Sequence, residues 1–197
     1  MISRLNESKI KKQLSAVQRQ VNISLKQEVP TRCPYCGGRM VIKKIGDFAP
    51  WSKRADMPFC VCEHYDDTCS CSVKLSRDRA GKLIPMGIPA DDNLKSLRCE
   101  AHHYMSEIVA LGIMRSNDDI YEWLSRREGI QRSQFHMSMF MEGRCQNIIL
   151  ALLETLSRYP EKAKGKVTAY HPVASNVRAF SESDPRAAKI LMELEVR

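Results

Sequence analysis

The sequence predicts an α+β protein in which a small cysteine-rich β unit is followed by a predominantly α-helical domain. Six of the eight cysteines lie between residues 33 and 71, in a stretch that also carries short β-prone runs. From residue 90 onward, apolar residues recur at helical spacing instead. We therefore expect four parts: an N-terminal amphipathic helix (1–30), the β unit (31–89), a helical domain (90–160), and a linker with a C-terminal amphipathic helix (161–197).

Composition excludes several classes of protein. The 197 residues are 43% hydrophobic and 27% charged, values typical of a folded domain and not of a disordered or collagen-like chain. No apolar run approaches the roughly 18–20 residues that a membrane-spanning helix needs. The first residues also lack the apolar block of a secretion signal. We therefore expect a cytoplasmic protein that contacts no membrane.

The N-terminal segment predicts one amphipathic helix. Between residues 6 and 27 the apolar residues are spaced alternately by four and three: Ile10, Leu14, Val17, Val21 and Leu25. Pro30 ends the segment, because the residue before a proline avoids helical geometry. Such a narrow stripe either packs on the rest of the protein or pairs with a second copy, which would make a homodimer.

Residues 31–89 predict short strands joined by turns. Residues 40–42 and 72–75 are β-prone, and 82–84 follow a turn at 79–81. Strands this short bury little apolar surface, so the unit needs a staple of another kind.

The rest of the chain predicts four amphipathic helices. Ser116 is placed to cap the second helix, Pro160 stops the third, and Asp184 with Pro185 opens the last. A strand is expected at 167–170. The expected helices cover about residues 91–112, 116–129, 142–159 and 183–194.

The strongest chemical signal is the run Cys33-Pro34-Tyr35-Cys36-Gly37-Gly38. Two cysteines separated by two residues place both sulfurs on one side of a tight turn, and the following glycine lets backbone amides point at them. In a reducing compartment, clustered cysteines bind metal more often than they form disulfides. A second pair of thiolates would complete a tetrahedral Zn²⁺ site of the zinc-ribbon type. Four thiolates leave no open coordination position, so the expected role of the metal is structural.

The second pair of ligands must come from two Cys-x-Cys pairs: Cys60, Cys62, Cys69 and Cys71. Alternate residues of a strand point to the same face, so both sulfurs of one pair do not readily chelate a single ion. One cysteine from each pair is therefore expected, and Cys62 and Cys69 are favoured because they bracket the turn at 63–68. Cys60 and Cys71 are then small buried residues or alternative ligands. A two-metal cluster using all six cysteines and His64 is a further arrangement.

The ordered motifs of residues 33–150 resemble a zinc-finger-containing family found mainly in bacteriophages and prophages. The likeness joins the opening knuckle and the turn at 62–69 to later motifs at 85–87, 94–102, 120–124, 136–140 and Cys145. The resemblance implies a zinc ribbon fused to a helical segment, located in the host cytoplasm if the chain is phage-encoded. It implies no reaction.

Three further residues of this chain match positions of the family pattern: His102, His136 and Cys145. Cys99 lies one helical turn from residues 102–103, so this group suggests a second metal or polar site, a Cys–His nucleophile pair, or ordinary core residues. His136 is alternatively placed to cap the third helix. No Ser-His-Asp, phosphate-loop or dinucleotide-binding pattern accompanies these residues. We therefore predict that the protein is not an enzyme.

The net charge of +8 favours a polyanionic partner, and residues 1–89 carry the whole of this excess. Within the predicted ribbon, phosphate-pairing cations and stacking rings share one short stretch. Nucleic-acid binding is therefore the predicted function, although a solvated basic surface also explains the charge. The candidate contacts are Arg39, Lys43, Lys44, Trp51, Lys53 and Arg54, with Phe48 beside them.

The alternative function is interaction with a host protein, in host takeover or defence evasion. The N-terminal stripe and the C-terminal tail would supply amphipathic surfaces for such a partner. Independently of the partner, packing on the helical core is an alternative to base stacking for Phe48 and Trp51.

Overall fold

The fold is that of a computed structural model, which describes residues 28–48, 50–65, 67–172, 174 and 176–196. The chain divides into two compact units, Met1–Asp91 and Asp92–Arg197, which we call the sheet unit and the helical unit. The predicted N-terminal helix, and the homodimer contact through it, fall on residues 6–27 and lie outside the described residues. The four-part division of the chain stays a prediction.

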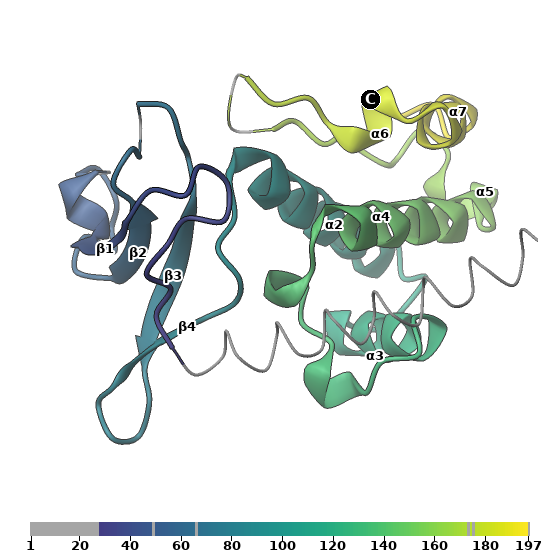
Figure 1. Cartoon of the computed structure of the whole chain (residues 1–197). Helices are drawn as coiled ribbons and strands as arrows, with labels where there is room; N and C mark the ends of the chain where they lie inside the picture. The colour runs from purple at the N-terminus through teal and green to yellow at the C-terminus, as the bar shows by residue number, and fades with distance from the viewer. Residues whose placement is uncertain (1–27, 49, 66, 173, 175, 197) are drawn as a thin grey trace, which may run out of the picture. The chain divides into compact units, whose positions relative to one another are not determined.

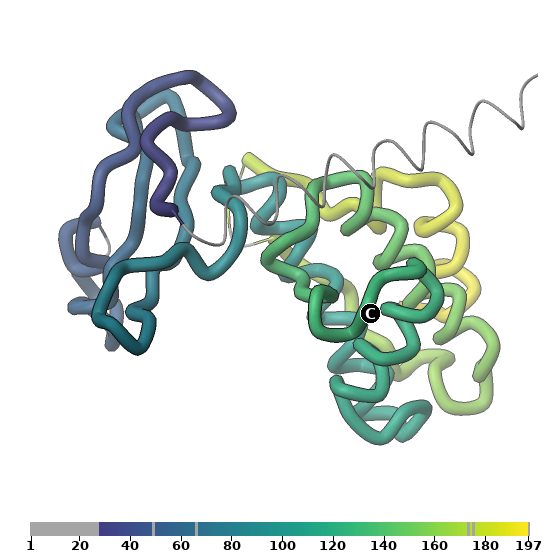
Figure 2. The backbone as a smooth tube through the Cα atoms, turned by 60° about the horizontal axis from the view of Figure 1, so that its bottom comes forward, coloured from purple at the N-terminus to yellow at the C-terminus, as the bar shows by residue number. Residues whose placement is uncertain are grey.

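The sheet unit is a four-stranded antiparallel sheet whose order, β1-β2-β3-β4, follows the chain. Figures 1 and 2 show the chain passing up and down through these strands. Strands occur at the three predicted places, whereas β2 was not predicted. The bounds are β1 (Met40–Lys44), the 3-10 turn η1 (Ile45–Asp47), β2 (Pro58–Cys62), β3 (Ser72–Arg77) and β4 (Leu83–Pro85).

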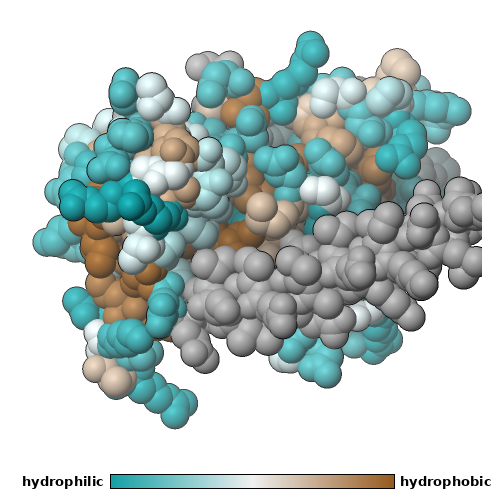
Figure 3. All heavy atoms as spheres, in the orientation of Figure 1, coloured by the Kyte–Doolittle hydropathy of each residue, from teal (hydrophilic) through white to brown (hydrophobic). Residues whose placement is uncertain are grey.

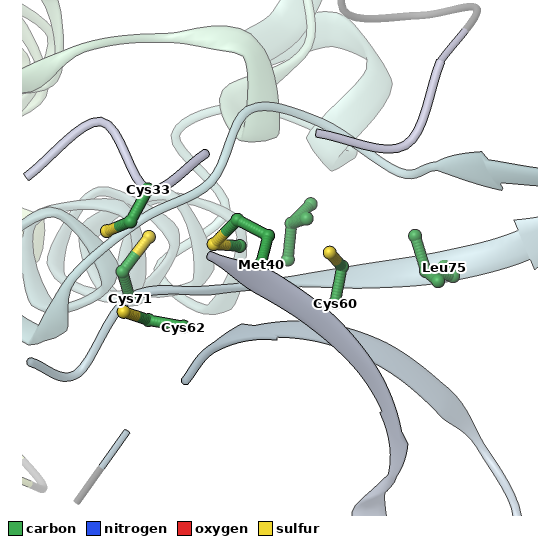
Figure 4. Close-up of a cluster of buried hydrophobic side chains, with 7 residues drawn as sticks. Cys33, Met40, Cys60, Cys62, Cys71 and Leu75 are labelled. Carbon is green, nitrogen blue, oxygen red and sulfur yellow. The ribbon is translucent and has the colours of Figure 1, made fainter. Parts of the chain in front are cut away.

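The strand register places the cysteines on one face of the sheet. Met40 pairs with Cys62, and Cys60 pairs with Ile42 on one side and Val73 on the other; residues paired in this way point to the same face. Figure 4 shows the buried cluster that results. Four of its seven members are cysteines: the cluster is Cys33, Met40, Cys60, Cys62, Cys71, Val73 and Leu75.

A sheet of this size does not enclose all of its apolar side chains. Ile42 is 54% exposed, and Figure 3 shows hydrophobic side chains at the surface over the strands, with hydrophilic ones around them. The core consists largely of thiols, and some apolar side chains of the sheet lie at the surface. This fits the expectation that another interaction stabilises the unit.

The helical unit is built around α2 (Asp92–Ala110) and α4 (Glu142–Ser157), which pack against each other. Helix α4 also contacts the three helices that follow it, and α2 contacts α3 (Figure 1). No helix among the described residues is long and apolar enough to cross a membrane. The remaining helices are α3 (Asn117–Arg127), α5 (Pro160–Ala163), α6 (Phe180–Ser183) and α7 (Pro185–Glu193), with short 3-10 turns η2 (Arg132–Gln134) and η3 (Met137–Met139).

Local signals in the sequence locate these helices. The Ser116 hydroxyl accepts the Asp119 amide at the start of α3, and the Asp184 carboxylate accepts two amides of the first turn of α7, as N-caps do. Because the chain consists of a sheet unit and a helical unit, the predicted α+β class is confirmed.

The segment before α7 is anchored to α2 by buried polar groups. The Glu100 carboxylate is fully buried and accepts the backbone N–H groups of Phe180 and Ser181, each at 2.8 Å. The Tyr104 hydroxyl donates to the Ser181 hydroxyl at 2.9 Å. A buried carboxylate with two donors is fully compensated, so these contacts fix α6 on α2.

Two predictions for the helical unit are wrong. Residues 167–170 form no strand; the segment is held by its buried Val167 and by a bond from His103 Nε2 to the Thr168 carbonyl at 2.8 Å. His136 does not cap α4, because Met141 occupies the N-cap position and provides no side-chain bond there.

Candidate metal centre

The four favoured cysteines come together in the structure. The sulfur atoms of Cys33, Cys36, Cys62 and Cys69 all lie within 4.8 Å of one another. Cys36 Sγ is 3.4 Å from Cys62 Sγ, and Cys33 Sγ is 3.6 Å from Cys69 Sγ. Zn–S distances of about 2.3 Å set the edges of a tetrahedron at about 3.8 Å. The four sulfurs, which we call the cage, thus fit a tetrahedral Zn²⁺ ion.

A tight turn at residues 33–38 supplies the first two sulfurs. The Cys33 N–H donates to the Gly38 carbonyl at 2.8 Å, and the Gly37 N–H donates back to the Cys33 carbonyl at 3.0 Å. Gly37 has a φ of 74°, in the left-handed region where a side chain is costly. This turn leaves Cys33 and Cys36 on the same side, directly before β1.

The end of β2 and the turn after it supply the other two sulfurs. Cys62 is the last residue of β2, and its N–H donates to the Cys71 carbonyl at 3.0 Å. The Tyr65 N–H donates to the Cys62 carbonyl at 3.0 Å, and the Cys69 N–H donates to the His64 carbonyl at 3.1 Å. The turn predicted at 63–68 therefore folds back and returns Cys69 to the side of Cys62.

Backbone amides point at every sulfur of the cage. Each sulfur receives the N–H of the residue two positions further along the chain, and an N–H aimed at sulfur stabilises the thiolate, the form that binds metal. This chemistry of the donor set, together with the distances, fits a metal-binding cage. The donors are Tyr35 to Cys33, Gly38 to Cys36, His64 to Cys62 and Cys71 to Cys69.

Burial opposes ionisation to a different extent at each cysteine. At Cys33 burial favours the thiol, but the amides of Cys36 and Tyr35 outweigh it and lower the pKa to about 7. The exposed Cys36 has its pKa lowered by the Gly38 amide, and then by His64. At Cys62 burial prevails and raises the pKa to about 12. Burial also raises the pKa of Cys69. A divalent cation among the sulfurs would favour the thiolate at all four.

The two remaining cysteines of the stretch are buried outside the cage. The Cys60 thiol donates to the Pro30 carbonyl at 3.5 Å, and burial raises its pKa to about 11. In Figure 4 it lies along β2 toward Leu75, away from Cys33 and Cys62. Cys71 is also fully buried. Among the residues that the structure describes, the cage is the one group of three or more metal-ligating side chains. The described residues therefore offer no second group of ligands for the second ion of a two-metal cluster.

Two neighbours of the cage were not assigned a role next to a single metal ion. His64 Nδ1 lies 3.8 Å from Cys36 Sγ, and the Arg39 N–H donates to Glu63 Oε1 at 2.6 Å. From the sequence, His64 was expected only as a ligand in a two-metal cluster. The closeness of His64 to Cys62 in the sequence was the signal that could have suggested its contact with Cys36.

The residues proposed for a second site do not converge. Cys145 is buried, and its thiol faces the Phe140 carbonyl at 3.9 Å. His102 and His136 each contact the ring of Tyr121, with centroids 6.3 and 6.4 Å apart, and burial lowers the pKa of His102. The two histidines pack around Tyr121, and the three side chains make no metal-ligating group within the described part of the chain.

All six candidate nucleic-acid contacts are exposed, but they occupy two places. Arg39 precedes β1 beside the cage, and its guanidinium lies 3.9 Å from Glu63. The other five belong to what we call the basic hairpin end: Lys43 and Lys44 at the far end of β1, and Trp51, Lys53 and Arg54 in the loop that follows.

Backbone bonds fold this loop onto the end of β1. The Gly46 N–H donates to the Ala55 carbonyl at 2.9 Å, and Lys44 Nζ pairs with Asp56 at 3.0 Å. Phe48 packs on the rings of Phe59 and Tyr65 in its own unit. The Phe48 ring therefore already has partners within the sheet unit.

Comparison with known families places these observations in context. Residues 29–155 match the family described as DUF3268, a zinc-finger-containing domain. This range is more than half of the chain. The chain belongs to this family. The matched range of the zinc-finger-containing domain holds the whole cage, all four strands, α2, α3 and all but the last two residues of α4. No curated protein and no solved structure shows a significant match to the chain.

Proposed function

We propose that the protein binds one structural Zn²⁺ ion through Cys33, Cys36, Cys62 and Cys69. The four sulfurs within 4.8 Å of one another and the membership of a zinc-finger-containing family support this assignment. A Zn²⁺ ion held by four thiolates has no open coordination position, so it would link the turn before β1 to the end of β2. Elemental analysis of the purified protein is expected to give one zinc per chain.

The sheet unit held by this metal, we further propose, binds nucleic acid through the basic hairpin end. The observation that carries the proposal is the exposure of Trp51, whose side chain is 82% accessible beside two basic residues, Lys53 and Arg54. No carboxylate among the described residues lies within ion-pair distance of these two cations or of Lys43. An exposed ring next to unpaired cations is suited to stack on a base while the cations meet phosphates.

Salt dependence tests this proposal directly. Three phosphate contacts, from Lys43, Lys53 and Arg54, predict that log K falls with log salt with a slope of about −3 on duplex DNA. Lys53→Ala is expected to make that slope shallower by about 1. Lys166→Ala is the matched control, because this exposed lysine lies in the helical unit and its loss should leave the slope unchanged.

Two results would count against nucleic-acid binding. The first is an absence of binding to random-sequence DNA and RNA at 50 mM salt, and the second is an affinity that does not change with salt. A stoichiometric protein retained by the full chain after nuclease treatment would instead favour a protein partner.

A further inference from the structure

Of the four cysteines of the cage, Cys36 is the most accessible to solvent. Cys33 and Cys62 are buried and Cys69 is intermediate, whereas Cys36 is exposed. A metal-bound thiolate at an exposed position is the one that protons, chelators and oxidants reach first. The groups that cover Cys36 should therefore decide how long the cage keeps its metal.

His64 lies against this sulfur. Its Nδ1 atom lies 3.8 Å from Cys36 Sγ, within hydrogen-bond range for sulfur. The His64 backbone is fixed because its own N–H points at Cys62 Sγ and its carbonyl accepts the Cys69 N–H at 3.1 Å. The residue is thus tied to three of the four cage cysteines.

Glu63 lies on the other side of the imidazole. Its Oε1 atom is 4.0 Å from His64 Nε2, and the same oxygen accepts the Arg39 N–H at 2.6 Å. The carboxylate is therefore anchored to the backbone that enters β1. The imidazole sits between this anchored carboxylate and the Cys36 sulfur, an arrangement that restrains the orientation of the ring.

Gly38 has no side chain, and this provides the space that the His64 ring occupies. A Cβ atom at this position would lie 3.1 Å from His64 Nδ1, 3.2 Å from Cε1 and 3.3 Å from Cys36 Sγ. These contacts are closer than ordinary van der Waals distances, so any larger residue would push the ring away from the sulfur. The absence of a side chain at Gly38 is thus a second, independent observation that His64 is seated against Cys36.

We propose that His64 is a positioning residue of the metal centre, which donates an Nδ1–H hydrogen bond to the Cys36 thiolate and shields it from solvent. The proposal rests on the proposed Zn²⁺ site. His64 acts through Cys36 and is not a ligand, because the four sulfurs already complete a tetrahedron. Glu63 orients the ring, and Gly38 admits it.

The test measures metal retention in the full-length, zinc-loaded protein. Zinc transfer to an excess of a chelating dye is followed for the wild type and for His64→Phe, which keeps an aromatic ring but removes the donor. Outer-shell substitutions weaken metal binding by about 10- to 100-fold, so His64→Phe should lose zinc correspondingly faster. Gly38→Ala should act in the same direction. His64→Asn, which places an amide N–H near the position of Nδ1, should restore much of the retention.

Two controls make the outcome specific. His171→Phe removes an exposed histidine of the helical unit and should leave the transfer rate unchanged. The Co²⁺-substituted His64→Phe protein should keep the thiolate-to-metal absorption of four sulfur ligands, because a positioning residue does not change the ligand set.

The proposal fails if His64→Phe retains zinc within twofold of the wild type, or if its Co²⁺ spectrum shows the loss of a ligand. It also fails if His64→Asn and His64→Phe release zinc at the same rate. A wild-type protein that contains no zinc would instead overturn the proposed metal site itself, so the two failures are distinguishable.

Discussion

Replacing Cys69 by serine should unfold the sheet unit and leave the helical unit intact. Cys69 is only partly buried, so the substitution costs little apolar contact and reports mainly on the metal. A serine hydroxyl is a poor ligand for Zn²⁺ compared with a thiolate. The cage would lose one of its four donors, and with it the link between the turn at 33–38 and the end of β2.

The expected loss exceeds what the non-cysteine members of the buried cluster supply. Structural zinc in small finger peptides contributes about 10–16 kcal/mol at pH 7. The buried cluster holds three residues that are not cysteines, Met40, Val73 and Leu75, and full burial of such side chains contributes about 1.5–3 kcal/mol each. The metal thus outweighs all three together. The helical unit buries its own core between α2 and α4, so it should not depend on the metal.

Hydrogen exchange read by peptide separates the two units. In Cys69→Ser, or in the wild type after chelation, the amides of β1, β2 and β3 should exchange at the rate of an unfolded chain, whereas those of α2 and α4 stay protected. Cys99→Ser is the matched control, because this cysteine is exposed on α2 and should change neither unit. Strand amides that stay protected in metal-free protein would refute the reasoning.

Three further predictions follow from the buried groups. At pH 8 the thiols of Cys62, whose pKa is about 12, and of Cys69, whose pKa is also raised, are protonated, so zinc binding should release at least these two protons. Affinity then rises with pH, and calorimetry in buffers of different ionisation enthalpy measures the release. Cys60→Ala should keep one zinc per chain by elemental analysis, whereas loss of the metal would make Cys60 a ligand. Glu100→Gln replaces one of the two accepting oxygens by an NH2 group that faces a backbone N–H, and it should destabilise the helical unit by about 1–3 kcal/mol in denaturant unfolding. The same change at Glu122, a surface ion pair with Arg126, should cost less than about 0.5 kcal/mol.

The helices could be predicted because their signals are local. Apolar spacing within one segment fixes the buried face of a helix, and caps such as Ser116 and Asp184 mark its first turn. None of these signals depends on a residue far away in the sequence. The predicted and observed starts of α3, α4 and α7 accordingly agree within two residues.

Two of the errors concern strands, whose formation depends on partners distant in the sequence. Residues 58–62 form a strand because β1 and β3 pair with its two edges, and both partners lie outside the segment itself. Residues 167–170 are β-prone but have no strand beside them, since α2 supplies their contact through His103. Intrinsic β-propensity is a weak guide in both cases, because pairing and burial decide the outcome.

The choice between Cys60 and Cys62 shows what a sequence argument about spacing leaves out. Both residues point to the same face of β2, so alternation alone does not separate them. The amide two positions after Cys60 belongs to Cys62, and it is committed to the Cys71 carbonyl at 3.0 Å. The amide two positions after Cys62 belongs to His64, beyond the end of the strand, where it is free to point at sulfur.

The end of the strand therefore selects the ligand. A cysteine inside a paired strand has its neighbouring amides used by the sheet, whereas a cysteine at the last paired residue keeps an amide that can stabilise its thiolate. Cys69 follows the same rule, because the N–H of Cys71, directly before β3, points at its sulfur. The cage thus forms where backbone pairing stops, and its four cysteines are those whose following amides the sheet does not use.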